Sequence, residues 1–177
     1  MGEFNNDKKW SDKWLPRLKS LCGQCLIETA PDNIDKQENT DLVMPMLSIA
    51  CRVRRYCYYH LYKDEFTIRA HRDTGATTEF EKMSFGLGDY MIYAFADKEE
   101  NRLQRWTLMD LSVLRRWLCD SKEFVITSGM SNGDGTYFFP FKYIDLPEDL
   151  IVACSWKTKI IKRDRLPQQT ELSFYAA

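Results

Sequence analysis

The chain has 177 residues, of which 44% are hydrophobic and 14% aromatic, and its formal net charge is -1. This content is enough for a compact core, so we predict a single domain over residues 1–177. The near-neutral charge excludes a general polyanion binder held by bulk positive charge, so any nucleic-acid contact has to come from a local cluster. No run approaches the length of about 18 apolar residues needed to span a membrane, and the N-terminus has no apolar signal core, which predicts a soluble, cytoplasmic protein.

The N-terminal part of the chain predicts a helix followed by a loop. Apolar residues recur at three- and four-residue intervals over residues 10–27, and a proline in this run places the start of the regular helix at about Leu15. Residues 30–40 are polar and contain turn-forming residues, so we predict a loop there. The six cysteines have no regular spacing, which is typical of free thiols in a reducing compartment. Cys22 and Cys25 have metal-ligand spacing, so zinc binding, a redox pair and buried thiols are the alternatives.

The middle of the chain predicts a strand-rich core with helices between the strands. Three β-like runs follow one another through short turns and predict an antiparallel meander. Thr77 or Thr78 can cap the next helix, because a hydroxyl group satisfies free amides at a helix start, and Asp110 can cap the one after it. A continuous apolar run between these helices predicts a central strand buried on both faces. The predicted strands are 42–44, 47–59, 65–71, 90–96 and 103–109, and the predicted helices are 79–83 and 111–119.

The C-terminal part predicts a β-hairpin and a short helix. Residues 131–135 read Ser-Asn-Gly-Asp-Gly, with glycine where a hairpin turn needs positive φ, between strands at 124–127 and 136–143. Residues 146–155 begin with a proline and two acids and predict a short helix. Residues 163–177 are polar and predict a flexible tail. The fold class is therefore α/β, with a mixed β-sheet, flanking helices and a C-terminal hairpin and short helix.

The first hairpin of the meander brings charged residues together. If residues 45–46 form a two-residue turn, Asp41 lies opposite Ala50 across the hairpin. Alternation along the strand then places Arg52 and Arg54 on the same face. The third strand adds a second polar row that consists of Thr67, Arg69 and His71. The pattern predicts a positively charged face with a single carboxylate at its edge.

This arrangement resembles the restriction-endonuclease-like superfamily, the PD-(D/E)XK nucleases. The resemblance covers residues 10–118 and rests on the order of the elements, a β-β-β-α-β core, with Ala50-Cys51-Arg52 where that family carries Glu-x-Lys. It extends to Thr78-Glu79 and to Gly86-Leu-Gly-Asp-Tyr90, which precede the aromatic strand. The resemblance implies a metal-dependent nuclease, or a nuclease-derived protein, that acts on DNA phosphodiesters.

The resemblance also implies roles for individual residues. In that family an Asp and a Glu hold Mg²⁺, which polarises the scissile phosphate and activates water. Asp41 is then a metal ligand, and a carboxylate from the following helix, Glu79 before Glu81, replaces the missing Glu. Arg52 and Lys82 then contact the phosphate. The implied catalytic residues are Asp41, Glu79, Arg52 and Lys82, and the residues expected to bind nucleic acid are Arg52, Arg54, Arg69, His71 and Arg72.

Each of these residues also has a simpler interpretation. Asp41 can be a turn residue, Glu79 can be an ordinary acid in a first helical turn, and the arginines can pair with both in a structural ion network. Phosphate binding needs only cations and donors, whereas hydrolysis needs a placed metal. The alternative function is therefore a catalytically inactive module of the same fold that binds nucleic acid, another protein or a second copy of the chain, as an accessory protein of a phage or plasmid type would. Stacking platforms for unpaired bases are offered by Tyr56, Tyr58, Tyr59 and Tyr62.

Overall fold

The structure is a computed structural model that describes residues 2–22, 28–38, 40–44, 47–121, 130–131 and 135–156. No helix within these residues has the length and apolar character needed to cross a membrane. In chain order the elements are α1 (Gly2–Asp12), α2 (Leu15–Cys22), β1 (Glu28–Thr29), α3 (Asp32–Glu38), β2 (Leu42–Met44), β3 (Leu47–Arg54), η1 (Tyr56–Tyr58), α4 (Tyr59–Tyr62), β4 (Glu65–Arg72), α5 (Glu79–Ser84), β5 (Tyr90–Ala96), β6 (Leu103–Asp110), α6 (Leu111–Asp120), β7 (Met130–Ser131), β8 (Thr136–Lys142), η2 (Tyr143–Asp145), η3 (Glu148–Leu150) and β9 (Ile151–Cys154).

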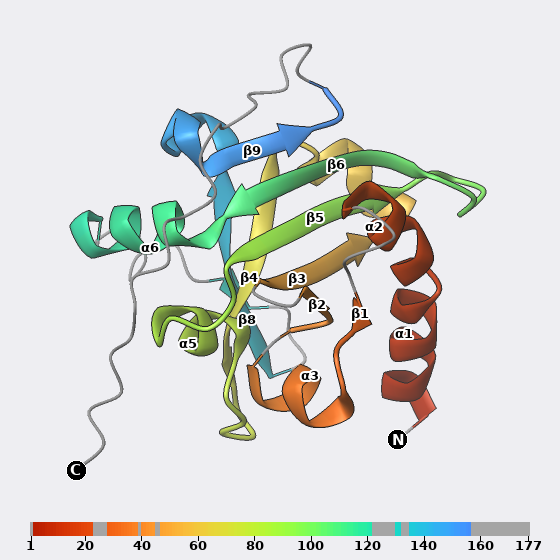
Figure 1. The fold of residues 1–177 in the computed structure, drawn as a ribbon, viewed down its shortest axis with the longest axis horizontal. Helices are drawn as coiled ribbons and strands as arrows, with labels where there is room; N and C mark the ends of the chain where they lie inside the picture. The colour runs from red at the N-terminus through yellow and green to blue at the C-terminus, as the bar shows by residue number, and fades with distance from the viewer. Residues whose placement is uncertain are drawn as a thin grey trace.

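The larger sheet has six strands in the order β1-β2-β3-β5-β6-β9 (Figure 1). It is mixed, because β3 and β5 pair in parallel while the other neighbours pair antiparallel. Leu42 lies opposite Ile49 in the β2–β3 pair, which is the register that a two-residue turn predicts. β5 lies inside this sheet and residues 91–96 are buried, so the prediction of a central strand is confirmed.

The third predicted strand does not continue the meander. β4 belongs to a second sheet of order β4-β8-β7, and in Figure 1 β4 and β8 run across the strands of the larger sheet. β3 ends at Arg54, after which η1 and α4 carry the chain out of the larger sheet. Phe66 and Ile68 of β4 are then buried in the core between the layers. The meander prediction was wrong because an alternating pattern shows which residues lie on each face of a strand, but it does not determine which strand pairs with it.

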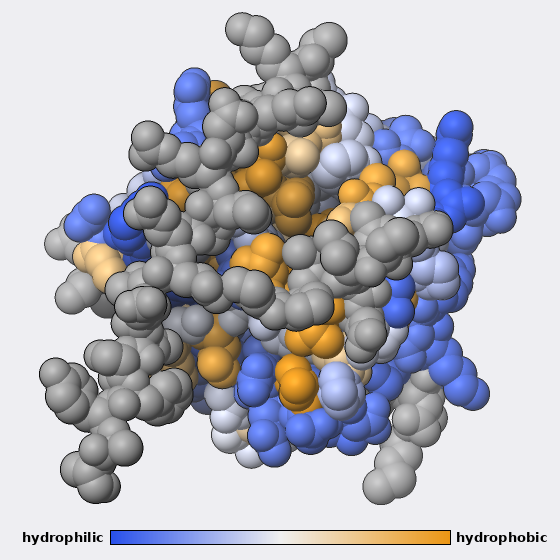
Figure 2. All heavy atoms as spheres, in the orientation of Figure 1, coloured by the Kyte–Doolittle hydropathy of each residue, from blue (hydrophilic) through white to orange (hydrophobic). Residues whose placement is uncertain are grey.

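Two hydrophobic cores lie on the two faces of the larger sheet. Trp14 and Leu18 from the N-terminal helices pack on one face, together with Ile49 and Val53 of β3. Ala50 belongs to the other core, which contains residues of β4, β8, α5 and α6. Alternate residues of β3 therefore divide between the two cores, as the strand pattern predicts. Figure 2 shows hydrophilic residues over the outer side of α1, which is consistent with the exposure of residues 6–9.

The N-terminal helix is divided into two. The second helix begins at Leu15, as predicted, and its proline occupies the first turn, where a missing amide hydrogen is tolerated. The helix predicted from residue 10 instead runs from Gly2 to Asp12 and ends before the turn at residues 13–14. Residues 23–27, which complete the predicted helix and include Cys25, lie outside the described residues.

The segment predicted as a loop at residues 30–40 contains the helix α3. The carbonyl oxygen of Pro31 accepts the amides of Ile34 and Asp35 at 2.9 and 3.0 Å, which closes the first turn. Asp32 adds negative charge to that turn, where it favours a helix start. The loop prediction was therefore wrong, because the proline that suggested a loop lies at the start of a short helix.

β8 has an antiparallel partner, as the predicted hairpin requires, but this partner is β7 at residues 130–131, and residues 146–155 do not form the predicted short helix. β7 and β8 pair antiparallel, with Ser131 opposite Tyr137. The helix predicted at residues 146–155 is the 3₁₀ turn η3 followed by the edge strand β9. Leu150 and Ile151 are buried, and β9 pairs with the edge of β6. This burial and pairing favour a strand over the helix that the proline and acids predicted. The predicted segments that lie outside the described residues are 124–127, 132–134 and 163–177.

The Gly-Leu-Gly-Asp-Tyr motif anchors the start of the parallel strand pair. The Asp89 carboxylate accepts the Ser48 amide at 2.7 Å, and the Asp89 amide donates to the Ser48 carbonyl at 2.9 Å. The Asp89 carbonyl accepts the Leu111 amide at 2.9 Å, which ties the same turn to the start of α6. Arg115 of α6 also donates to the Gly88 carbonyl at 3.0 Å. This turn therefore sets where β3 begins, and so where its arginines lie.

Candidate functional site

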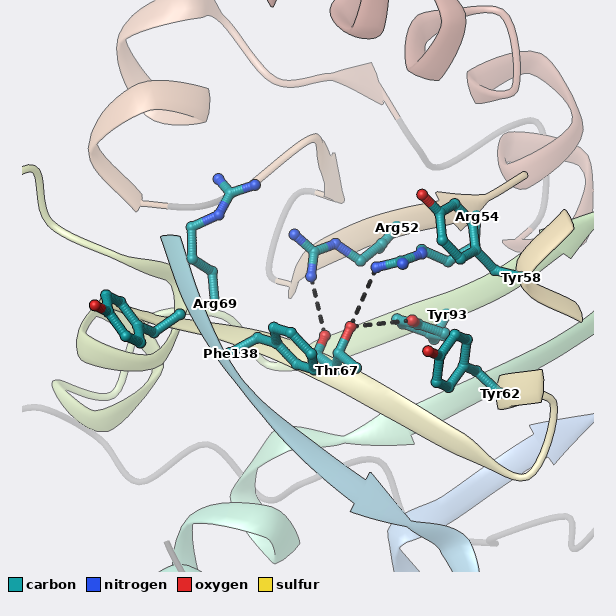
Figure 3. Close-up of a pocket in the computed structure, with 9 residues that line it drawn as sticks. Arg52, Arg54, Tyr58, Tyr62, Thr67, Arg69, Tyr93 and Phe138 are labelled. Atoms are coloured by element: carbon teal, nitrogen blue, oxygen red, sulfur yellow. Dashed lines mark hydrogen bonds between the residues drawn. The ribbon is translucent and has the colours of Figure 1, made fainter. Parts of the chain in front are cut away.

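A cavity of about 150 Å³ lies between β3 and β4 (Figure 3). Its lining contains three guanidinium groups, several aromatic rings and a threonine, and no carboxylate is found among the described residues that line it. The lining residues are Arg52, Arg54, Tyr58, Tyr62, Thr67, Arg69, Tyr93, Tyr137 and Phe138. We call this cavity the arginine pocket.

Thr67 is the centre of the polar floor of the arginine pocket. Its carbonyl oxygen accepts Arg52 Nη1 at 3.0 Å, and its hydroxyl oxygen accepts Arg54 Nη1 at 3.4 Å. The same hydroxyl lies 3.2 Å from the hydroxyl of Tyr93, which comes from β5. Figure 3 shows both arginines of β3 pointing toward Thr67 of β4. The two polar rows predicted from the sequence thus meet, although they belong to different sheets.

Aromatic rings from η1 and α4 form one side of the pocket. The Arg54 guanidinium lies over the Tyr58 ring, 4.4 Å from its centroid, in a cation–π contact. Tyr58 and Tyr62 lie one helical turn apart, with ring centroids 6.3 Å from each other. Both residues remain about 40% exposed, at 40% and 39%, so part of each side chain is accessible to a ligand.

Glu79 lies at the first turn of α5, where Thr78 caps the helix through a capping box with Glu81. Glu79 Oε1 lies 3.0 Å from Arg52 Nη2, and its Oε2 accepts the backbone amide of Arg69 at 3.0 Å. Both side chains of the ion pair are largely buried, at 17% and 18% exposed. Glu79 therefore links β3, β4 and α5, and it fixes the position of the Arg52 guanidinium through Nη2.

Asp41 lies just before β2 and is bonded across the hairpin. Its Oδ2 accepts the backbone amide of Cys51 at 2.8 Å. Burial raises the pKa of the Asp41 carboxyl to about 6, and the negative charges of Asp35 and Glu79 add to this effect, although the Cys51 amide opposes it. Asp41 and Glu79 thus affect each other electrostatically but are held by different donors.

Mg²⁺ takes oxygen ligands in near-octahedral geometry, and the nearby candidates are the carboxylates of Asp41 and Glu79. Glu79 uses both carboxylate oxygens, for Arg52 and for the Arg69 amide, and Asp41 uses one oxygen for the Cys51 amide. In the described part of the chain, no group of three or more His, Cys, Asp or Glu side chains could hold a metal ion. The Arg52 guanidinium occupies the position beside Glu79 that a metal ion would take, so Mg²⁺ binding stays a prediction.

The remaining predicted site residues lie outside the arginine pocket. The Lys82 ammonium donates to the Lys36 carbonyl at 2.6 Å, so it joins α5 to α3. His71 Nε2 lies 3.8 Å from Asp73 Oδ1, and its ring lies beside Tyr137. Arg72 lies at the end of β4, opposite Thr136. Of the five predicted nucleic-acid-binding residues, the fold brings Arg52, Arg54 and Arg69 together and leaves His71 and Arg72 beyond the lining.

Some lining residues were not predicted as site residues. Tyr93 carries one of the two side-chain hydroxyls in the otherwise apolar strand β5, and this was the available signal. Tyr137 and Phe138 come from β8, and their contribution depends on the unpredicted pairing of β8 with β4. Of the four tyrosines predicted as stacking candidates, Tyr58 and Tyr62 line the pocket, whereas Tyr56 and Tyr59 do not.

Cys22 and Cys25 have metal-ligand spacing, and of these two Cys22 lies within the described residues. It is free and half-buried, and burial raises its pKa to about 11. Burial also raises the pKa of the Cys51 thiol well above its ordinary value. Without a metal ion, a thiol with a raised pKa is a poor nucleophile at neutral pH, because attack needs the thiolate. Metal binding by Cys22 stays a prediction.

The protein is thus an α/β protein with a mixed sheet and a basic, partly aromatic pocket between its two sheets. Comparison with models of known protein families gave no match, and comparison with curated proteins gave none. The function is therefore inferred from the chemistry of the pocket.

Proposed function

We propose that this protein binds nucleic acid through the arginine pocket, as a non-hydrolytic module on a nuclease-like frame. The observation that supports this most directly is the position of Arg54. Its guanidinium directly contacts a hydroxyl and an aromatic ring, and it forms no ion pair with any residue that the structure describes. Its charge also acts on the carboxyl of Glu65, where burial raises the pKa and Arg54 opposes this larger effect. A partly buried cation whose direct contacts are neutral is stabilised when an anion joins it.

The other polar groups of the pocket suit a phosphate. Arg52 pairs with Glu79 through Nη2, and its Nη1 donates to the Thr67 carbonyl on the pocket floor. Thr67 and Tyr93 add hydroxyl groups, which can donate to phosphate oxygens once they reorient. Guanidinium groups bind phosphate through paired hydrogen bonds, so two of them beside one hydroxyl pair form a suitable cradle.

Nucleic acid is favoured over a simple anion because aromatic rings adjoin the cations. Tyr58, Tyr62 and Tyr137 are between 38% and 40% exposed beside the guanidinium groups. Combined cationic and aromatic surfaces are the usual means by which proteins bind a nucleic-acid strand. The resemblance of the element order to PD-(D/E)XK nucleases supports the same class of ligand, and the replacement of the expected acidic residue by Ala50 supports binding without cleavage.

Metal-dependent cleavage of DNA is the second candidate. It is favoured by the electrostatic coupling of Asp41 and Glu79, which are the two carboxylates that the nuclease resemblance implies. It requires Glu79 to exchange its Arg52 partner for a metal ion. Labelled DNA incubated with Mg²⁺ or Mn²⁺ tests this candidate, with Asp41→Asn as the inactive control.

Binding is tested by fluorescence anisotropy with labelled oligonucleotides in the absence of divalent metal. Arg54→Gln is expected to weaken binding by at least about tenfold, which is the size of one lost charge-assisted contact. Arg116→Gln is the matched control, because Arg116 is exposed on α6, contacts only Asp149 among the ion pairs described and does not line the pocket. Equal affinity of the wild type and Arg54→Gln contradicts the proposal.

A further inference from the structure

The arginine pocket has a polar floor and an aromatic rim. The floor consists of the Arg52 and Arg54 guanidinium groups and the hydroxyls of Thr67 and Tyr93. The rim consists of rings from two separate elements, α4 and its preceding turn on one side and β8 on the other (Figure 3). A ligand that fills the pocket therefore presents an anionic group inward and a flat apolar group to the rim.

The size of the pocket limits what enters it. A cavity of about 150 Å³ is the size that holds a single aromatic ring in an engineered protein core. The pocket is thus large enough for one phosphate or one ring, while the remainder of a nucleotide lies against the rim.

The exposed rings matter because of what they can contact. Tyr62 is 39% exposed and Tyr137 is 38% exposed, so part of each side chain lies outside the core and is accessible to a ligand. In a duplex the faces of each base are covered by neighbouring bases, and a protein reaches mainly the phosphates and the base edges. Only an unpaired base offers a face that can stack on a tyrosine ring.

We infer that the arginine pocket binds an unpaired nucleotide, with its phosphate on the Arg52–Thr67–Arg54 floor and its base against the tyrosines of the rim. This inference rests on the proposed function and names its ligand as single-stranded nucleic acid. Duplex DNA, which satisfies the floor but leaves the rim without a partner, binds more weakly.

The test compares three labelled ligands of about 20 nucleotides, a length that exceeds the usual site size of a strand-binding domain. They are single-stranded DNA, single-stranded RNA of the same sequence and duplex DNA, each titrated by anisotropy without divalent metal. The wild type is expected to bind a single strand at least about tenfold more tightly than the duplex. A preference between DNA and RNA identifies the sugar, and either single strand supports the inference.

The variant that isolates the rim is Tyr62→Leu. It is expected to weaken single-strand binding roughly tenfold, which is the order expected for one lost base–aromatic stack, and to leave duplex binding unchanged. Tyr62→Phe keeps the ring and is expected to restore single-strand binding. Tyr56→Leu is the matched control, because Tyr56 lies on the same segment, bonds His60 and does not line the pocket.

Two results separate the failure of this inference from the failure of the proposed function. If Arg54→Gln weakens all three ligands alike, while Tyr62→Leu changes none of them, the pocket binds phosphate but does not select unpaired bases, and the inference is overturned. If Arg54→Gln also changes nothing, the proposed function falls with it. Circular dichroism of each variant shows whether the fold is retained, and Tyr62→Phe tests the ring independently of any loss of packing.

Discussion

The Arg52 guanidinium lies 3.0 Å from the Glu79 carboxylate and joins the centre of β3 to the first turn of α5. The other oxygen of Glu79 accepts the Arg69 amide of β4. One carboxylate thus links the three elements that position the arginine pocket. The pair also reduces the positive charge of Arg52 toward the pocket, whereas the direct contacts of Arg54, the Thr67 hydroxyl and the Tyr58 ring, are neutral.

Arg52→Ala is expected to destabilise the protein. It leaves the largely buried Glu79 carboxylate without its cation, which costs about 1–3 kcal/mol of unfolding free energy. Urea denaturation measures this, and the double variant Arg52→Ala with Glu79→Gln is expected to recover part of the loss because no charge is left unpaired. Lys36→Ala, at an ion pair whose side chains are 73% and 88% exposed, is the control and is expected to change stability by less than about 0.5 kcal/mol.

The salt dependence of binding is expected to change in Arg54→Gln. If Arg54 neutralises one phosphate, its removal lowers the slope of log K against log salt concentration by about 0.7 to 1. Affinities measured across a salt series give this slope. An unchanged slope with lower affinity would show that Arg54 acts through packing and not as a phosphate partner, and Arg116→Gln gives the reference.

Asp41 is expected to make the protein less stable as the pH rises from acidic to neutral. Its pKa is about 6 in the folded protein against an ordinary value of 3.8, so between these values the folded state binds more protons than the unfolded state. The stability from the protonated carboxyl is fully present below about pH 4 and is lost as the pH rises through about 6. The loss is on the order of 3 kcal/mol at most.

Asp41→Asn tests this pH dependence. The amide keeps an oxygen acceptor for the Cys51 amide but does not ionise, so the variant is expected to be more stable than the wild type at neutral pH. Urea denaturation of both proteins across the acidic to neutral range measures the difference. A difference that stays constant with pH would contradict the prediction.

Gly88→Ala is expected to destabilise the protein more than Gly86→Ala. Both glycines have positive φ, 78° and 89°, so each alanine costs about 1–2 kcal/mol of backbone strain. A Cβ at Gly88 would also lie 3.2 Å from a methyl carbon of the buried Leu111, whereas a Cβ at Gly86 meets nothing within 4 Å. Overpacking adds roughly 1–3 kcal/mol at Gly88, and thermal or urea unfolding measures the difference. Equal costs would show that Leu111 relaxes freely.

Several parts of this fold follow from short-range patterns. The register of β2 and β3 follows from a two-residue turn, the buried strand β5 from its apolar run, and the start of α5 from the Thr78 cap. Each depends on residues that are near one another in the sequence. The same reasoning failed for α3, where a polar composition and a proline predicted a loop, and for β9, where a proline and two acids predicted a helix. Neither pattern reveals what the segment packs against.

The contacts that form the arginine pocket could not be predicted from such short-range patterns. Alternation placed Arg52 and Arg54 on one face of β3, and Thr67 and Arg69 in one row of β4, but it did not say that the two rows would meet across two sheets. The pairing of Glu79 with Arg52 likewise could not be distinguished from metal binding in the sequence. Local chemistry decides which face a side chain takes, whereas the partners of a charged group depend on how whole layers pack, and that is decided only when the two sheets close over a shared core.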